Sequence, residues 1–362
     1  FLDFTKAFDT ISHNILFSKL ESLGITGPSL TFIKTTFLIV NNQSALGGNS
    51  NVKIYNQGVP QGSILGPLPF CIYINDLPDC LQDSKVILYA DDTTISISHK
   101  SLPTLINMLN KELTNVVEWC RLNNLILNPL KTQFMVFKTS QKMLPFIPQV
   151  FIDNHFIPAS NCVCFLGVKL DPHLKFTNHI LYVKQKTAFG IRSLIKSRPF
   201  FFSLEALLSL YFAFIHSHIT YGITSWGNTY NIHISSVQHI QNQAMRIITN
   251  SSSYSNATPL LQANCILTVS GLFNFHLIIL LYKQLNKQLV FDLIDASLLT
   301  NTNSTRFAHS HNFLLPKCNT NYGKMTSAFA VIKLWNNLPY TLKSSSSFHA
   351  FKRDLKNFIL HN

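Results

Sequence analysis

The stretch VILYADDTTISIS at residues 86–98 decides how the first half of this chain folds. It holds two runs rich in β-branched and aromatic residues, Val86–Ala90 and Thr93–Ser98, on either side of the pair Asp91-Asp92. Such runs favour strands, and the short connection predicts a hairpin with the two carboxylates at its bend. Because a hairpin makes part of the sheet antiparallel, the pattern favours an α+β fold over a doubly wound parallel one.

Strand-like and helical patterns surround this hairpin. Phe1–Phe4 predicts a short strand, and apolar residues at helical spacing from Phe8 to Leu23 predict a helix. Leu102–Cys120 predicts a long amphipathic helix, and Gln133–Phe137 returns to strand character. The second half of the chain is mostly helical, and its best candidates are Val183–Ile195, Leu204–Ile215, Ile234–Ile248 and Leu272–Leu285.

Charge divides the chain into two halves. The 362 residues carry a net charge of +13, and 46% of them are apolar, which is enough for two or three domains and excludes a disordered tail. Residues 1–171 hold 12 basic and 12 acidic side chains, whereas residues 172–362 hold 17 and 4. The whole positive excess therefore lies in the second half, for which a polyanion is the natural partner.

The seven cysteines are odd in number and scattered, unlike those of a secreted disulfide scaffold. We therefore expect an intracellular protein, in the nucleus or cytoplasm, and the absence of a signal peptide and of a first Met suggests a piece of a longer chain. The apolar run Ala206–Ile223 is interrupted by His216, Ser217 and His218, so it predicts a buried helix and no membrane contact.

Three carboxylates belong to segments that we expect to be buried. Asp3 lies in the strand-like run Phe1–Phe4, and Asp91 and Asp92 lie at the bend of the apolar hairpin. Buried carboxylates are costly, and a bound cation is one way to lower that cost. Mg²⁺ suits such oxygen ligands, and two ions could serve an in-line phosphoryl displacement. Spacing alone leaves open that Asp3 caps a turn and that the pair is solvated.

Three longer runs carry a family resemblance, namely FLDFTKAFDTISHNIL at 1–16, QGVPQGSILGPLPFCIYINDL at 57–77 and YADDTT at 89–94. In this order they resemble motifs A, B and C of reverse transcriptases, above all those of jockey-like non-LTR retrotransposons. The similarity continues through Leu127–Thr132 (motif D) and Phe165–Gly167 (motif E). It extends to IQNQAMRIIT at 240–249 and KLWNNLP at 333–339.

The resemblance implies a fold and an activity. It implies an α+β, partial right-hand polymerase: a palm with an antiparallel sheet and helices at 1–170, a basic, helical thumb at 171–250, and a mostly helical C-terminal region of unknown role at 251–362. It implies an RNA-directed DNA polymerase that extends a primer 3′-hydroxyl, with two Mg²⁺ ions (or Mn²⁺), deoxynucleoside triphosphates, an RNA template and a DNA primer. The alternative is a catalytically inactive remnant that still binds nucleic acid.

Residue roles follow from the matching positions. Asp3, Asp91 and Asp92 would bind the metal ions, and Phe8 would be a steric gate beneath the sugar, unless it is an ordinary core aromatic. Gln61 and Gly62 would lie near the incoming nucleotide, and Lys131 is either a proton donor to pyrophosphate or a surface lysine. The primer grip would be Phe165, Leu166 and Gly167. The thumb would hold the duplex through Lys184, Lys186, Arg192, Lys196 and Arg198, unless these form a merely solvated basic face.

The chain also departs from the family pattern. The match begins at motif A, so the fingers are missing, and we expect the chain to be inactive or weakly active alone. Pro69 stands where relatives usually have an apolar residue, and we expect it to disturb the helix after motif B. Cys162 and Cys164, followed by His173 and His179, could be taken for a zinc cluster. We expect no zinc, because cysteines one residue apart belong to a strand of the core.

Overall fold

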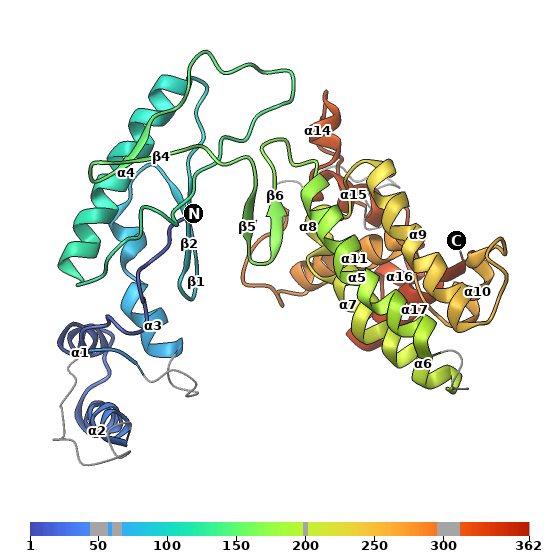
Figure 1. The fold of residues 1–362 in the computed structure, drawn as a ribbon, viewed down its shortest axis with the longest axis horizontal. Helices are drawn as coiled ribbons and strands as arrows, with labels where there is room; N and C mark the ends of the chain where they lie inside the picture. Colours follow the sequence, from blue (N-terminus) through green and yellow to red (C-terminus); the bar gives the residue numbers. More distant parts are fainter. Residues whose placement is uncertain (44–56, 60–66, 198–201, 295–311, 362) are drawn as a thin grey trace. The chain divides into compact units, whose positions relative to one another are not determined.

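The computed structural model describes residues 1–43, 57–59, 67–197, 202–294 and 312–361, without the side chains of residues 38–43. The chain forms two compact units, Phe1–Gly167 (unit 1) and Val168–Asn362 (unit 2) (Figure 1). Helices and two-stranded antiparallel sheets occur together, which confirms the α+β class. Residues on both sides of position 250, where we placed a boundary, belong to the same compact unit.

Unit 1 combines helices with short strands. Its helices are α1 (His13–Ser22), α2 (Gly27–Gln43), α3 (Pro67–Ile74), the 3₁₀ turn η1 (Leu77–Cys80) and α4 (Leu102–Leu122). Its strands are β1 (Lys85–Tyr89), β2 (Asp92–Ser96), β3 (Val150–Ile152), β4 (His155–Ile157) and β5 (Val163–Phe165). One hydrophobic core joins the elements from α1 to β4, with Ile11, Leu16, Phe70 and Val116 fully buried.

The predicted hairpin is present, with a small shift of its bend. β1 and β2 pair antiparallel, with Val86 opposite Ile95 and Tyr89 opposite Asp92. The bend therefore consists of Ala90, which has a φ of 49°, and Asp91, whereas Asp92 is the first residue of β2. The hairpin is also less buried than expected, because Ile87 and Tyr89 are exposed on one of its faces.

The segment Phe1–Ser12 forms bridges in place of the long helix expected from Phe8. The amides of Gly58 and Val59 donate hydrogen bonds to the carbonyls of Ile11 and Phe8, both at 2.8 Å. Because these carbonyls are used outside a helix, α1 begins only at His13. Phe1–Phe4 is extended and makes single bridges, Leu2 to Thr93 and Phe4 to Leu127, without a continuous ladder.

Residues 133–137 are not the strand that their pattern predicts. Only Phe134 makes a bridge, a parallel one to Ala159. The apolar side chains of this segment instead line a cavity of about 410 Å³, together with residues of α4, β2, β3 and β4. The predicted strand is thus wrong, because residues 94–99 line the opposite part of that cavity and do not pair with this segment.

The expectation that Pro69 disturbs its helix is wrong. α3 begins at Pro67, so Pro69 lies in the first turn, where backbone N–H groups have no partner within the helix. Its side chain is buried beside Phe70 and Tyr73. A proline at this position costs the helix no hydrogen bond.

Unit 2 is mostly helical. It contains strand β6 (Val168–Leu170), α5 (Thr177–Ser197), α6 (Leu204–Tyr211), the π-helical turn η3 (Phe212–His216), α7 (Ser217–Thr220), α8 (Ile223–Trp226) and α9 (Asn231–Ile248). It continues with α10 (Ala257–Ala263), α11 (Val269–Leu285), α14 (Asn321–Lys324), α15 (Ser327–Asn336), α16 (Tyr340–Lys343) and α17 (Phe348–His361). All four helices predicted for this half are present, although the second ends in the π-turn.

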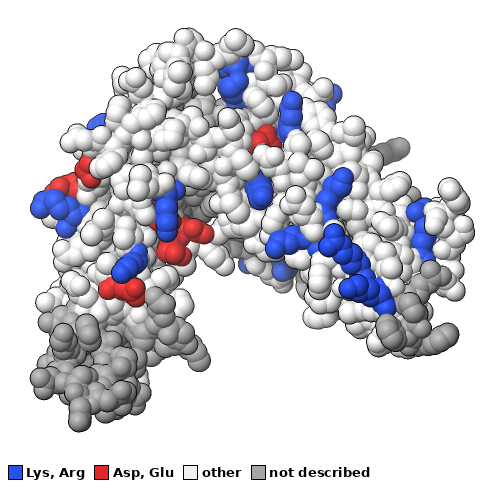
Figure 2. Space-filling model, viewed as in Figure 1, with Lys and Arg blue, Asp and Glu red and all other residues white. Residues whose placement is uncertain are grey.

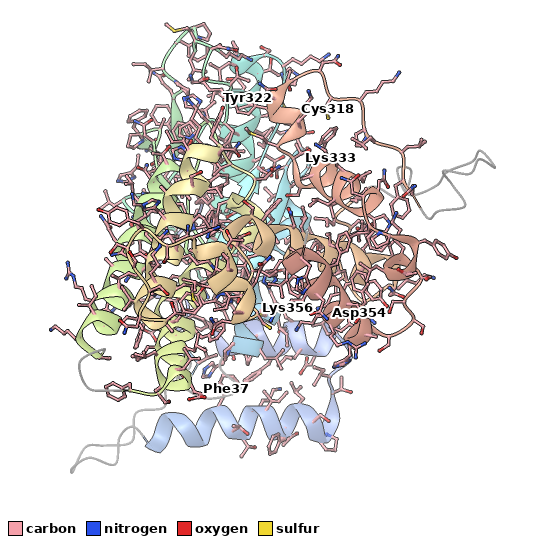
Figure 3. All side chains as sticks on the ribbon, turned by 90° about the vertical axis from the view of Figure 1, so that its right-hand side faces the viewer. Phe37, Cys318, Tyr322, Lys333, Asp354 and Lys356 are labelled. Atoms are coloured by element: carbon pink, nitrogen blue, oxygen red, sulfur yellow. The ribbon has the colours of Figure 1, made fainter. Side chains whose placement is uncertain are left out.

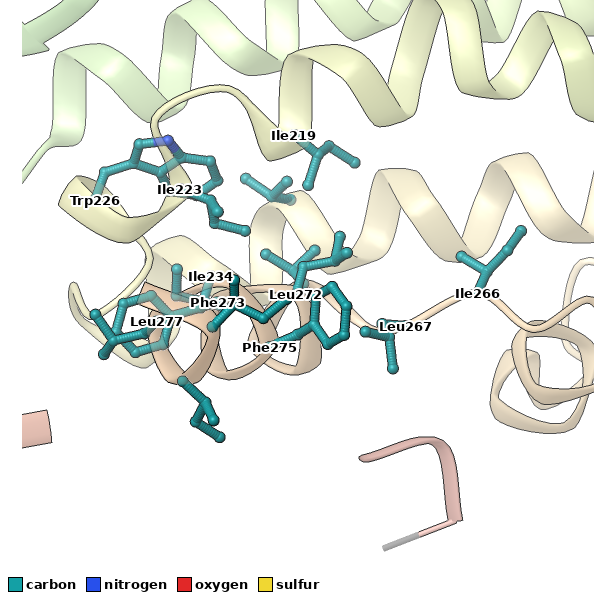
Figure 4. Close-up of a cluster of buried hydrophobic side chains, with 14 of the residues drawn as sticks. Ile219, Ile223, Trp226, Ile234, Ile266, Leu267, Leu272, Phe273, Phe275 and Leu277 are labelled. Carbon is teal, nitrogen blue, oxygen red and sulfur yellow. The ribbon is translucent and has the colours of Figure 1, made fainter. Parts of the chain in front are cut away.

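The core of unit 2 surrounds α11, whose buried side chains include Leu272, Phe273 and Leu277. Figure 4 shows these residues beside Ile223 and Trp226 of α8. Glycine allows the closest helix contact, since a Cβ on Gly190 of α5 would lie 2.5 Å from Cγ1 of Ile215. Tight apolar packing therefore holds the helices of unit 2 together.

The apolar run at 206–223 is divided among α6, the π-turn and α7, and its buried residues include Tyr211, Ile215 and Ile219. The prediction of a buried helical segment is confirmed. Within the described ranges, no helix is both long and apolar enough to cross a membrane.

Candidate active site

Asp3 is held by its backbone from two sides. The amide of Leu2 donates to the carbonyl of Thr93 at 2.8 Å, which places Asp3 beside the start of β2. On the other side, the amide of Asn128 donates to the Asp3 carbonyl at 2.8 Å, and the Asp3 amide donates to Oγ1 of Thr132 at 3.2 Å. The Asp3 backbone is thus fixed between the hairpin and the turn that follows Leu127.

The three carboxylates share one electrostatic environment. Partial burial raises the pKa of Asp92, and the neighbouring carboxylates of Asp91 and Asp3 raise it further. The side chains themselves lie at the surface, since Asp91 and Asp92 are exposed and Asp3 is half-buried. Their sequence neighbours Leu2, Phe4 and Thr93 are buried. The expected cost of burying these carboxylates is therefore largely absent, and their mutual repulsion is what a cation would relieve.

The donor set fits a hard divalent cation. Carboxylate oxygens on adjacent extended segments are ligands that Mg²⁺ and Mn²⁺ accept, with further oxygens supplied by a substrate phosphate. Across the described ranges, no group of three or more His, Cys, Asp or Glu side chains is close enough to hold a metal ion by itself.

Phe8 lies at the junction between the first two motifs. Its carbonyl accepts from Val59, and its half-buried ring packs on Phe70 at a centroid distance of 4.7 Å. At the same junction, Gly58 has a φ of 89°, and a Cβ there would lie 3.1 Å from the Asp9 carbonyl oxygen. The ring contact suits a core aromatic, and the role of Phe8 as a steric gate stays a prediction. Gln61 and Gly62 lie outside the described residues.

Lys131 lies in the turn that holds Asp3. The carbonyl of Asn128 accepts from the amides of Lys131 at 3.3 Å and Thr132 at 2.9 Å, and the Asn128 side chain accepts from Leu130 at 3.1 Å. The Lys131 side chain is exposed. It thus stands next in sequence to a residue bound to Asp3, a position compatible with either of the roles considered for it.

Phe165, Leu166 and Gly167 form the end of β5 and the turn after it. Leu166 and Gly167 both have positive φ, 45° and 79°, and the division between the units falls directly after them. The Phe165 ring lies 5.8 Å from that of Phe1, centroid to centroid. Motif E and the start of motif A are therefore neighbours within unit 1.

The basic residues of α5 lie on its exposed surface. Lys184, Lys186, Arg192 and Lys196 are exposed, while Ile180, Val183, Ile191 and Leu194 are buried against the core of unit 2. Figure 2 shows Lys and Arg side chains gathered where Figure 1 draws α5. We call these four residues the α5 basic face. Arg198 lies outside the described residues.

His173 and His179 lie in the segment that leads into α5 and in its first turn. His179 is 1% exposed, its Nδ1 accepts from the Lys169 amide at 3.3 Å, and burial lowers its pKa to about 4. The Asp171 carboxylate accepts from the amides of His173, Lys175 and Phe176, which holds the entry to α5. Both residues therefore contribute to the start of the helical unit.

Sequence reasoning missed two residues that hold the site together. One is Thr132, whose 129-residue separation from Asp3 hides the contact. The other is Glu112 of α4, which is 1% exposed and accepts from the amides of Gln82 at 3.0 Å and Asp83 at 2.7 Å, just before β1. A lone glutamate on the apolar side of a predicted helix was the signal available for Glu112.

Comparisons with known proteins find relatives of this chain. A family model described as "Reverse transcriptase (RNA-dependent DNA polymerase)" matches residues 1–170. Among curated Drosophila melanogaster proteins, the chain is 29% identical over 287 residues to a probable RNA-directed DNA polymerase from transposon X-element, covering 76% of this chain and 31% of that protein.

Two further relatives from the same organism extend the match. The probable RNA-directed DNA polymerase from transposon BS is 28% identical over 72% of this chain, and the RNA-directed DNA polymerase from mobile element jockey is 26% identical over 70%. The chain spans about a third of the length of these relatives, from 28% to 31%.

Proposed function

We propose that this chain, whose residues 1–170 match the reverse transcriptase family model, supplies the palm and thumb of an RNA-directed DNA polymerase of a non-LTR retrotransposon. The observation that carries the proposal is the hydrogen bond from Leu2 to Thr93, which brings the motif A carboxylate beside the motif C hairpin. Asp3, Asp91 and Asp92 would hold two Mg²⁺ ions, which activate a primer 3′-hydroxyl and neutralise the leaving oxygen when bound.

Other residues of the chain would position the carboxylates and contact the substrates. The Asn128–Thr132 turn and the Leu2–Thr93 hydrogen bond would position the backbone of Asp3. Glu112 would position the segment just before β1 by accepting from the Asp83 amide. Lys131 would donate a proton to the departing pyrophosphate, and Phe165–Gly167 would press the primer end toward the carboxylates. Phe8, Gln61 and Gly62 would contact the incoming deoxynucleotide.

The α5 basic face would hold the template–primer duplex through its phosphates. Lys184, Arg192 and Lys196 are exposed, and no residue between Glu205 and Asp292 is acidic. Each phosphate contact that is lost should lower the slope of log K against log salt by about 0.9 for B-form DNA, so replacing three residues should lower it by two to three.

Primer extension on an RNA template, by the chain with a complete upstream segment restored, tests the proposal. Asp91→Asn should abolish Mg²⁺-dependent extension, with a loss of about 10³-fold or more, while the protein stays folded. Asp79→Asn removes the same charge from the exposed η1 turn and should leave extension unchanged. Extension that survives Asp91→Asn would overturn the assignment, and an inactive parent protein that still binds nucleic acid would indicate the remnant.

A further inference from the structure

Helices α11 and α17 of unit 2 run antiparallel across each other. The rings of Tyr282 and Phe351 stack at a centroid distance of 4.0 Å, and a Cβ on Gly271 would lie 3.2 Å from Cγ2 of Ile359. Between these two contacts lie His276 on α11 and Lys352 and Lys356 on α17. Along the helix axes, one histidine and two lysines therefore occupy the same stretch of the pair.

The π-helical turn adds a second histidine. His216 ends this turn, and α7, which follows directly, packs against α11. Cβ of Phe214 and Cγ1 of Ile215 lie 3.0 and 2.5 Å from where a Cβ of Gly190 would be, so these residues pack against α5. His216 instead contacts Phe212 edge-on at 5.1 Å, with its Nδ1 3.4 Å from the Tyr211 hydroxyl. Single π-turns inside helical segments are frequent at functional sites.

Charged neighbours within this group contribute to the pKa shifts of both histidines. Burial lowers the pKa of His216 to about 4, with further lowering by His276 and Lys356. Burial also lowers the pKa of His276, and Lys352 adds to the effect. The nearby Asp354 carboxylate is bound to Arg353 at 2.9 Å. Figure 3 labels Lys356 and Asp354, two positions apart on α17.

Three donors of this cluster have no acceptor in the part of the chain that the structure describes. Among the residues that the structure describes, the ammonium groups of Lys352 and Lys356 make no ion pair, and neither they nor the His276 ring makes a hydrogen bond. Lys352 and Lys356 are one helical turn apart on one face of α17, where like charges repel each other. An anion between them would remove this repulsion and accept their hydrogen bonds.

We propose that His216, His276, Lys352 and Lys356 form a binding site for a phosphate group, of the kind repeated along a nucleic-acid backbone. The tetrahedral oxygens of phosphate suit several donors from different elements, and the lysines supply the opposing charge. The site lies outside the carboxylate cluster and the α5 basic face, and it does not depend on the proposed polymerase function.

Histidine-ring NMR of the full chain, with inorganic phosphate as the probe, tests the site. The ring signals of His216 and His276 should shift with added phosphate and saturate. Lys352→Gln combined with Lys356→Gln should weaken the apparent affinity about tenfold. The matched control, Lys324→Gln with Lys333→Gln, removes two exposed charges from α14 and α15 and should leave the affinity unchanged. Signals that stay still, or equal binding by both double variants, would overturn the proposal.

A second measurement identifies the source of the phosphate. If the site takes a backbone phosphate, the α17 double variant should lower the salt slope of single-strand binding by about one to two relative to the control pair. If the phosphate-induced shifts are present but this slope is unchanged, the site binds free phosphate. The melting curve of the α17 double variant verifies that it is folded. Neither measurement uses primer extension, so either result can be interpreted whether or not the polymerase proposal holds.

Discussion

Unit 1 and unit 2 are stabilised by different kinds of contact. In unit 1, the carboxylate-bearing segments are joined by single bridges and by side chains that bind distant backbone, such as Thr132 to Asp3 and Glu112 to Gln82. In unit 2, long helices pack through fully buried residues such as Leu194 and Trp226. The difference teaches that unit 1 sets the positions of its polar groups by individual hydrogen bonds, whereas Lys343 is the one lysine or arginine that is buried among the described residues of unit 2.

The largest expected effect tests the apolar half of this comparison. Leu194→Ala removes a side chain that is 0% exposed in the core of unit 2 and should lower the free energy of unfolding by about 3 kcal/mol. Ile195→Ala, one residue further along α5 and 51% exposed, should cost less than about 1 kcal/mol. Denaturant unfolding measures both, and equal losses would show that α5 does not pack as described.

A smaller effect is expected from the buried carboxylate of unit 1. Glu112→Gln loses the charge that accepts two backbone amides and should lower stability by about 2 kcal/mol. Glu118→Gln, on the same helix but exposed and paired only with Arg121, should change it by less than about 0.5 kcal/mol. Faster hydrogen exchange at Gln82 and Asp83 would locate the change, and unaltered exchange there would contradict it.

The contact between Thr132 and Asp3 predicts a local effect of about 1 kcal/mol. Thr132→Val removes the acceptor of the Asp3 amide, which should exchange about five- to tenfold faster. Thr132→Ser keeps the hydroxyl and should restore slow exchange. If serine fails to restore it while the fold is intact, the methyl group, rather than the hydrogen bond, holds Asp3.

The smallest effect concerns pH. Because the pKa of Asp92 is raised in the folded protein, its ionisation disfavours folding at neutral pH. Asp92→Asn should therefore raise the melting temperature slightly at pH 7, and the gain should vanish as the pH falls below the ordinary aspartate value of 3.8, where both states are protonated. A gain that persists at low pH would point to a cause other than charge.

The sequence predicted best what depends on local pattern. The hairpin at 85–96, α4 and the helices of unit 2 follow from spacing of apolar residues within one element. The late start of α1 and the missing strand at 133–137 did not, because pairing with residues 57–59 and the lining of a cavity override local preference. Asp3, Asp91 and Asp92 were identified by resemblance, but the turn that holds Asp3 required the fold, since its residues lie more than 120 positions away.

The turn at Leu166–Gly167 has a consequence for how this protein can be handled. The two hydrophobic cores share no residue, since one is built from residues up to 157 and the other from residue 168 onward. A cut after Gly167 would sever the chain without opening either core, although it would separate β5 from β6, which pair in a two-stranded sheet. The two halves are therefore candidates for separate expression and for reassembly through that strand pair.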